Sequence, residues 1–145
     1  MKRVHNLVVA MAIALVLTGC ETPSELMATA PLSSDSLVGA EWIAVSVQGV
    51  VSLSDPRPVL RWERGDQVAG SGGCNRFLAS TVVSAESLRF QSLKPSGKPC
   101  LTAPTGQEDR FFKAVEETRA GRFEYGRLVL LDSKGNELAR MARSR

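Results

Sequence analysis

The chain has 145 residues, which leaves room for one ordinary domain. Hydrophobic residues make up 43% of the chain and charged residues 23%, a composition typical of a folded globular protein rather than a disordered one. The formal charge of +3 is too small to indicate nucleic acid as the main partner.

The N-terminus has the organisation of a secretory signal. Lys2 and Arg3 precede an unbroken apolar run over residues 7–17, which is too short to cross a membrane, since a spanning helix needs about 20 residues. The run ends in Leu-Thr-Gly-Cys, which resembles a bacterial lipobox, whose cysteine thiol carries the lipid. We expect residues 1–19 to be removed as a lipoprotein signal peptide and Cys20 to be the lipid attachment site; an ordinary cleavable signal with a chance cysteine is the alternative.

This processing predicts a location in the cell envelope. Several acyl chains hold a protein on a membrane stably, and Glu21, where an Asp commonly marks inner-membrane retention, favours the outer membrane, facing the periplasm. Loss of Lys2 and Arg3 lowers the formal charge to +1, and loss of His5 leaves no histidine in the mature chain.

The mature chain divides into a tether and one domain. Residues 20–36 begin with the lipidated cysteine and are rich in Ser, Thr and Pro without apolar periodicity, so we expect a flexible tether there. Residues 37–145 are long enough for a single modest core. Turn residues separate short apolar runs in this domain, and we expect strands at residues 42–47, 59–62, 67–70, 77–83, 88–93, 122–125, 128–131 and 137–141.

One helix is expected between these strands. Thr105 and Glu108 have the spacing of a capping box, and an inward apolar stripe follows at i, i+3, i+4 and i+7 from Phe111. Arg119 suits the last turn and Gly121 the C-cap, which predicts about four turns. The fold class is therefore mainly β (α+β), with an antiparallel sheet that curls or closes and one helix.

Two cysteines remain after lipidation. Cys74 and Cys100 would lie in an oxidising compartment, where an even pair usually forms a disulfide bond. A reactive thiol or a metal ligand is the alternative, but zinc needs four ligands and the mature chain has no histidine, so we expect neither a metal nor a cofactor.

A glycine cluster at residues 70–73 leads into Cys74, Asn75, Arg76 and Phe77. It lacks the lysine of a phosphate-binding loop, and no G-x-G-x-x-G pattern opens a helix here. Glycine permits positive φ and close backbone approach, and Asn tolerates the left-handed region. A strained connection between two strands is one interpretation, and a ligand-binding loop is the other.

The same segment resembles the G-x-x-GCN-x-F motif of the META domain, found in HslJ-like heat-shock lipoproteins. The motif places Gly70, Gly73, Asn75, Arg76 and Phe77 in a family segment that is structural and open to a binding role. Other matches across the domain are Leu37-Val38-Gly39 with Trp42, Pro58 to Trp62, Leu88 with Phe90, Cys100, Glu108 with Phe111 or Phe112, and Leu128 to Gly135. The residues before Cys100 depart from the family's Thr-rich approach, because here they read Lys94 to Pro99. The resemblance implies a curled antiparallel sheet or lipocalin-like partial barrel with one helix packed across it. It also implies an envelope location and a link to stress tolerance, and it supplies no catalytic residues.

The residues offer little to an enzyme. Without histidine, Ser-His-Asp and Cys-His catalytic sites are impossible. A pair of carboxylates acting as acid and base, or a Ser-Lys pair, remains as an alternative catalytic site. Trp42 and Trp62 either belong to the core or line a ligand cavity. Arg140, Arg143 and Arg145 are expected in a solvated tail, with a contact to anionic lipid or lipopolysaccharide as the alternative.

Two function classes remain. The first is a non-catalytic, lipid-anchored envelope module that contacts another envelope protein or the cell wall and supports stress tolerance. The second is a carrier or sensor of a small apolar ligand held inside the curled sheet. A small barrel is readily filled by its own side chains, which favours the first class.

Overall fold

A computed structural model describes residues 29–100 and 106–144 of the chain. These residues form one antiparallel sheet of nine strands in the order β1-β7-β8-β9-β2-β3-β4-β5-β6. The strands are β1 (Thr29–Ala30), β2 (Glu41–Val47), β3 (Val59–Arg64), β4 (Gln67–Ser71), β5 (Arg76–Val83), β6 (Leu88–Pro95), β7 (Ala120–Glu124), β8 (Arg127–Leu131) and β9 (Glu137–Arg143). The eight strands expected from the sequence are all confirmed, and β1 is an addition.

The strands alternate between a buried and an exposed face, as one half-buried sheet requires. In β3, Leu60 and Trp62 are fully buried, whereas Arg61 and Glu63 are exposed. The strands β8 and β9 form a hairpin, in whose turn the Asp132 carboxylate accepts hydrogen bonds from the backbone amides of Lys134 and Asn136.

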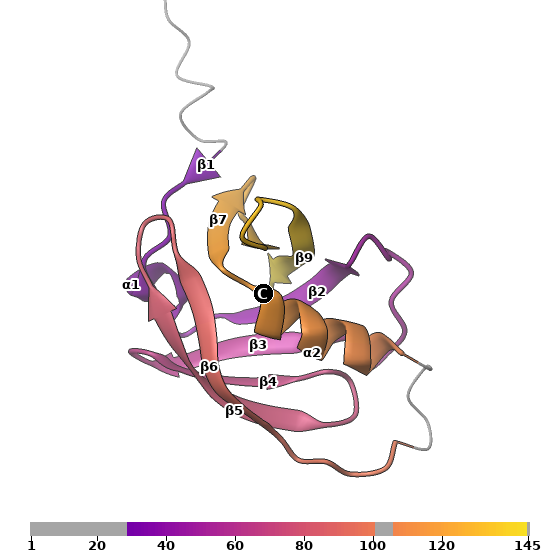
Figure 1. The fold of residues 1–145 in the computed structure, drawn as a ribbon. Helices are drawn as coiled ribbons and strands as arrows, with labels where there is room; N and C mark the ends of the chain where they lie inside the picture. Colours follow the sequence, from indigo (N-terminus) through magenta and orange to yellow (C-terminus); the bar gives the residue numbers. More distant parts are fainter. Residues whose placement is uncertain (1–28, 101–105, 145) are drawn as a thin grey trace, which may run out of the picture.

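The sheet curls until its two ends meet along a seam. The amide of Leu88 at the start of β6 donates a 3.2 Å hydrogen bond to the carbonyl of Arg119, just before β7. A Cβ on Gly121 of β7 would lie 3.0 Å from Leu88 and 3.3 Å from Leu32, which follows β1. Figure 1 shows β1 and the short helix α1 (Ser34–Leu37) beside the upper end of the β5–β6 hairpin. The predicted curled sheet is therefore confirmed.

The helix α2 (Gln107–Glu117) covers the hollow side of this sheet and contacts β2, β6, β8 and β9 (Figure 1). Its buried apolar side chains are Phe111, Ala114 and Val115, three members of the predicted stripe. Trp42 and Trp62 lie in the same core and are only 2% and 0% exposed, so the core interpretation of both is confirmed.

Both predicted ends of this helix are wrong. The helix begins after Gly106, which has a positive φ of 83° and forms no side-chain cap. The carboxylate of Glu108 binds another segment instead of capping its own helix, and Thr105 lies outside the described residues. At the other end Thr118 takes an extended conformation and ends the helix. Gly121 is not a cap but a position inside β7, where any side chain would crowd Leu88.

The expected tether contains part of the fold. Residues 29–36 supply β1 and most of α1, and the fold therefore begins before the predicted boundary at residue 37. Ser33 and Ser36 cap α1 reciprocally, each accepting a hydrogen bond from the other's backbone amide. Leu32 and Leu37, on either side of this cap, are buried in the core.

The prediction of a solvated C-terminal tail is also wrong. Arg140 and Arg143 belong to β9, which lies between β8 and β2 in the sheet. Arg140 forms ion pairs with Glu124 and Glu137, and the Arg143 guanidinium lies 6.0 Å from the centre of the Trp42 ring. Arg145 lies outside the described residues.

Candidate functional site

The family-like segment over residues 70–77 connects β4 to β5 and faces the first turn of α2. Most of its members have a definite task in this connection. Its two outer glycines provide space, Cys74 and Asn75 provide cross-links, and Phe77 reaches the core.

Gly70 makes room for an aromatic ring. A Cβ at this position would overlap the ring of Phe77 and come within 2.7 Å of the carbonyl oxygen of Val59. The ring of Phe77 then stacks edge-on against Phe112, at 5.6 Å between centroids, and lies 6.4 Å from Phe111. The glycine therefore allows β5 to be joined to α2 through an aromatic cluster.

Gly73 is needed for its backbone conformation and for close approach. Its φ is +119°, and a Cβ here would lie 2.7 Å from the carbonyl oxygen of Pro56. The preceding residue is equally constrained, because a Cβ on Gly72 would lie 2.5 Å from Cγ of Glu108. The connection between the two strands therefore uses a backbone conformation and close approaches that require glycine.

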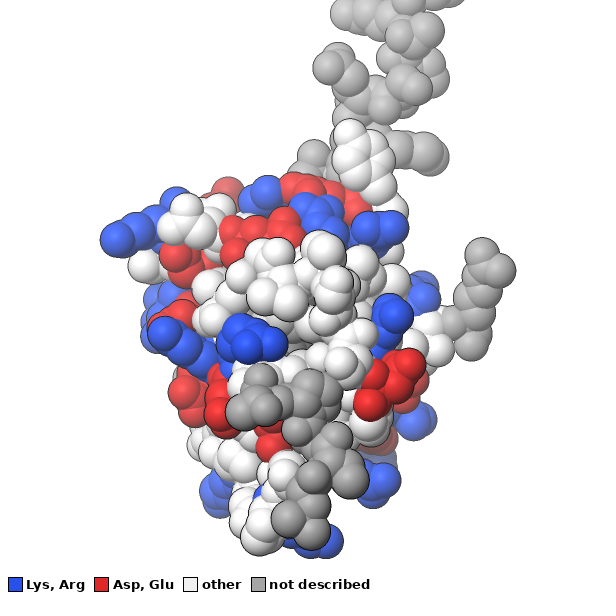
Figure 2. All heavy atoms as spheres, turned by 90° about the vertical axis from the view of Figure 1, so that its right-hand side faces the viewer, with Lys and Arg blue, Asp and Glu red and all other residues white. Residues whose placement is uncertain are grey.

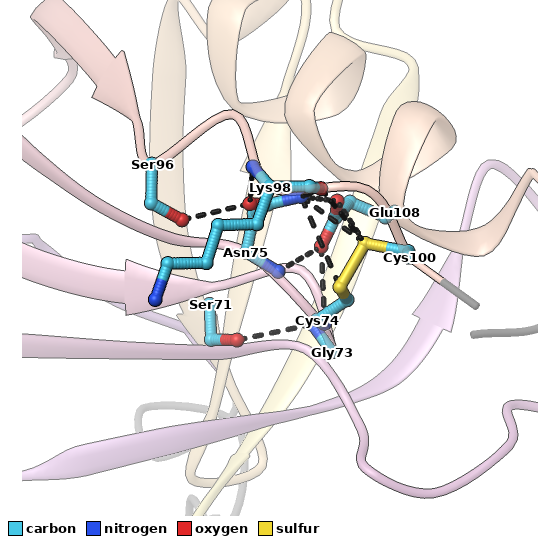
Figure 3. The surroundings of a disulfide bond; sticks show 8 residues. All are labelled: Ser71, Gly73, Cys74, Asn75, Ser96, Lys98, Cys100 and Glu108. Carbon is cyan, nitrogen blue, oxygen red and sulfur yellow. Dashed lines mark hydrogen bonds between the residues drawn. A yellow bond between two sulfur atoms is a disulfide. The ribbon is translucent and has the colours of Figure 1, made fainter. Parts of the chain in front are cut away.

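The predicted disulfide joins Cys74 to Cys100 with 6.0 Å between their Cα atoms. Cys74 lies in the β4–β5 connection and Cys100 lies in the segment that runs from β6 toward α2 (Figure 3). The bond therefore fastens the loop before the helix to the strands that the helix covers.

Asn75 is the centre of a hydrogen-bond network beside this disulfide (Figure 3). Its side chain is buried, and its oxygen accepts hydrogen bonds of 2.7 Å from the Lys98 amide and the Ser96 hydroxyl. Its amide nitrogen donates to the Lys98 carbonyl at 3.0 Å and to Oε1 of Glu108 at 2.7 Å. Both polar ends of the side chain are therefore used inside the protein.

Glu108 completes the network from the helix side. Its Oε2 accepts hydrogen bonds from the backbone amides of Asn75, at 2.6 Å, and Cys74, at 3.0 Å. The adjacent Gln107 binds the backbone of Ser54 in both directions, at 2.8 and 3.0 Å. The sequence pattern predicted that Glu108 caps its own helix, and it gave no role to Gln107. The one feature that could have indicated their contacts is that two polar residues stand directly before the buried helical stripe.

The same cluster is the candidate for a metal site in the described part of the chain. The ligand-type atoms of Cys74, Cys100 and Glu108 all lie within 4.8 Å of one another. The two sulfur atoms are bonded to each other, and the carboxylate already accepts three short hydrogen bonds. The donor set therefore suits a structural cross-link better than a cation.

Arg76 is the member of the segment that leaves the cluster, since its side chain is exposed on the outer face of β5. Near it an open hollow of about 460 Å³ lies over Ala69 and Gly70, bordered by Leu78 and Lys94. A second hollow, of about 360 Å³, adjoins it over Val68 and Ala79. These hollows open on the sheet's outer face, not inside the curl where the alternative function class places an apolar ligand.

A separate charged cluster covers the outer face of β7–β9. Glu124 accepts hydrogen bonds from Arg122 at 2.6 Å and from Arg140 at 2.8 Å, which together hold the pKa of this carboxyl below its usual value. Arg140 also pairs with Glu137, and the two carboxylates raise the pKa of its guanidinium. Val129, which faces Arg122 and Arg140 across the strands, is fully buried beneath these side chains.

Figure 2 shows the end of the molecule where α2 begins. Basic and acidic side chains are interspersed around an uncharged central area on this face (Figure 2). No helix in the described ranges is both long and apolar enough to span a membrane. Cys20, the expected lipid attachment site, lies outside those ranges.

Comparison with known proteins finds a family model and two solved structures that are similar to this domain. The META domain family model matches residues 35–145. A solution NMR structure of a protein from Burkholderia xenovorans is similar at 17% identity and a TM-score of 0.58, covering 97% of this chain and 99% of that one. Another NMR structure matches at 20% identity and a TM-score of 0.60, covering 75% of this chain and 93% of that one. Among curated proteins, none matches.

Proposed function

We propose a function from one premise: the chain belongs to the META domain family. It is a non-catalytic module of the bacterial cell envelope, anchored by lipid at Cys20, that contacts another envelope component and contributes to stress tolerance. The outer membrane, facing the periplasm, is its location.

The observation that carries this proposal is how the family segment uses its polar groups. Asn75 and Glu108 direct their side-chain oxygens and nitrogens to backbone and side-chain partners of the same chain. A catalytic carboxylate or amide needs a free position toward a substrate. These residues instead hold the helix, the disulfide and two strands together, which supports a scaffold that acts through its surface.

The anchor is supported by the sequence. A basic start, an apolar run over residues 7–17 and the Leu-Thr-Gly-Cys motif follow one another in the order that lipoprotein processing requires. The disulfide between Cys74 and Cys100 fits the oxidising compartment to which this route leads.

Metabolic labelling tests the anchor. Cells that express the full chain with labelled palmitate are expected to give a labelled band in the outer-membrane fraction. Cys20→Ala is expected to remove the label and to change the fractionation. Label retained by Cys20→Ala, or a band absent from the envelope, would contradict the anchor.

A second experiment tests the non-catalytic role. In a strain that lacks the protein, survival under envelope stress is expected to follow the amount of folded protein supplied. Glu108→Gln, which keeps the shape of the side chain, should restore survival as far as its folded level allows. Full folded levels without any rescue would indicate that the carboxylate has a chemical role.

A further inference from the structure

The outer face of the sheet has two unlike halves. On β7–β9, Arg122, Glu124, Glu137 and Arg140 pair with one another above the buried Val129. Positive and negative charges are therefore satisfied within that half.

The half formed by β5 and β6 carries basic side chains and apolar side chains together. Arg76, Leu78 and Val82 occupy alternate outward positions on β5, and the registers place Lys94 beside Leu78 and Arg89 beside Val82. Leu78 is 67% exposed and Val82 is 49% exposed, two of the four large hydrophobic side chains exposed among the described residues. We call these five residues the basic outer surface.

The cations of this surface are not neutralised by the acidic residue that lines the adjoining hollow: Glu63 of β3 lies there beside Lys94, but it pairs with Arg61. None of the ion pairs found in the described ranges involves Arg76, Arg89 or Lys94. The strands β5 and β6 themselves contain no acidic residue. Exposed aliphatic side chains among unpaired cations are the pattern of a surface that meets an anionic, partly apolar partner.

The position of the chain's entry points to the partner. Leu32, just after β1, lies at the seam with Leu88, which begins β6, so the chain enters the domain beside the basic outer surface. Residues 21–28 separate Cys20 from β1 and span at most about 30 Å even when fully extended. An anchored domain is therefore never far from the bilayer, and a weak surface contact suffices at such an effective concentration.

We propose that the basic outer surface rests on the anionic lipid bilayer, with Arg76, Arg89 and Lys94 at the headgroup phosphates and Leu78 and Val82 at the headgroup–acyl boundary. The proposal rests on the lipid anchor proposed above for its effective concentration. It adds an orientation, in which β7–β9 and their paired charges face away from this contact.

Vesicle sedimentation tests the contact without the anchor. The probe protein is residues 21–145, which contain every described element and lack Cys20. It is expected to sediment with vesicles of phosphatidylcholine and phosphatidylglycerol (7:3) at millimolar lipid in low salt, and not with pure phosphatidylcholine. Each basic residue near an anionic surface contributes about fivefold to binding, so Arg76→Glu with Lys94→Glu should lower partitioning by at least about 25-fold.

Matched variants distinguish an effect of the basic outer surface from an effect of net charge alone. Arg127→Glu with Lys134→Glu changes the net charge equally at exposed positions outside this surface, and it should lower partitioning much less. Leu78→Ser should weaken binding several-fold, and Tyr125→Ser, at another exposed position, should not. Circular dichroism and a mass 2 Da below the reduced value confirm that each variant is folded and oxidised.

Three results would overturn the proposal: no sedimentation with the anionic vesicles, equal losses for the two charge-reversal pairs, or binding of poly-L-glutamate at this face without binding of vesicles. The last result would assign the surface to an acidic protein. Because the probe lacks Cys20, failure here leaves the palmitate result intact, and failure of palmitate labelling leaves this result intact.

Discussion

Asn75 shows how much of the connection between β4 and β5 depends on one buried amide. Its oxygen and nitrogen bind the segment before Cys100, and the nitrogen also binds Glu108 on α2. No hydroxyl or apolar side chain presents a donor pair and an acceptor pair in the same plane. The side chain of Asn75 therefore joins three segments: the β4–β5 connection, the segment before Cys100 and the first turn of α2.

We expect Asn75→Ala to lower the free energy of unfolding by about 3 kcal/mol, because the buried side chain loses several part-buried hydrogen bonds at once, including those with the Lys98 amide and the Glu108 carboxylate. Urea denaturation measures this loss. Asn136→Ala, at an exposed turn amide, is the control and should cost less than about 1 kcal/mol. Equal small losses for both variants would show that the network adds little stability.

Gly70 is required by its neighbour's ring rather than by its own φ. Gly70→Ala should lower the free energy of unfolding by about 1–3 kcal/mol, because the new methyl overlaps Phe77 and the Val59 carbonyl. Ala69→Ser, on the outer face, is the control. In a double-mutant cycle measured by urea denaturation, Phe77→Leu should recover part of the loss; strict additivity would contradict the steric explanation.

Among the elements, the segment from β6 to α2 depends on its covalent link. Removing the disulfide with Cys74→Ser and Cys100→Ser should lower the free energy of unfolding by about 3.5 kcal/mol, the chain-entropy value for a sequence separation of 26. Urea denaturation of the oxidised protein and the double variant measures the difference. A difference below about 1 kcal/mol would mean that Asn75 and Glu108 hold the segment without the bond.

The ion pairs on β7–β9 should give a pH dependence of known sign. The pKa of Glu124 is lowered in the folded protein, so its contribution is complete above the ordinary value of 4.5 and is lost as the pH falls through the lowered value. Glu124→Gln should therefore cost about 1 kcal/mol at pH 7, with the difference from the parent shrinking below pH 4.5. Thermal unfolding of the parent and the variant at pH 7 and pH 3 measures the cost and its decrease. The same difference in stability at both pH values would contradict the conclusion that the ion pairs of Glu124 cause it.

Apolar alternation was a sound guide to the strands, because it reports which face of a strand is buried. It failed at the helix ends, where distant contacts decide. Glu108 has the spacing of a cap, yet the amides of Cys74 and Asn75 bind its carboxylate. Gly121 looks like a helix stop, yet it is a strand position that must stay small beneath Leu88. Local patterns do not reveal partners more than thirty residues away.

At the scale of the whole molecule, the fold depends on residues that look like a linker. A chain that begins at residue 38 lacks β1, α1, Leu32 and Leu37, and it should be less stable by several kcal/mol than one that begins at residue 21. Urea denaturation of the two chains measures this. Equal stabilities would show that the seam between β6 and β7 holds without them.

The fold class and the disulfide were predictable, since strand spacing and two cysteines in an oxidising compartment indicate them directly. The division of the outer face was not. Arg122, Glu124 and Arg140 look like scattered surface charges in the sequence, and only the strand registers place them together over Val129. The same registers gather Arg76, Arg89 and Lys94 around exposed aliphatic side chains.

The short strand β1 also determines how the domain takes up mechanical load. A pull on the chain before Thr29 acts first on two residues at the end of the sheet, which pair only with Glu124 and Phe123. Such a short strand should peel from β7 at low force, while Leu32 and Leu37 remain buried as a second hold. Under tension on the anchor side, the chain should therefore lengthen at β1 before the hydrophobic core unfolds.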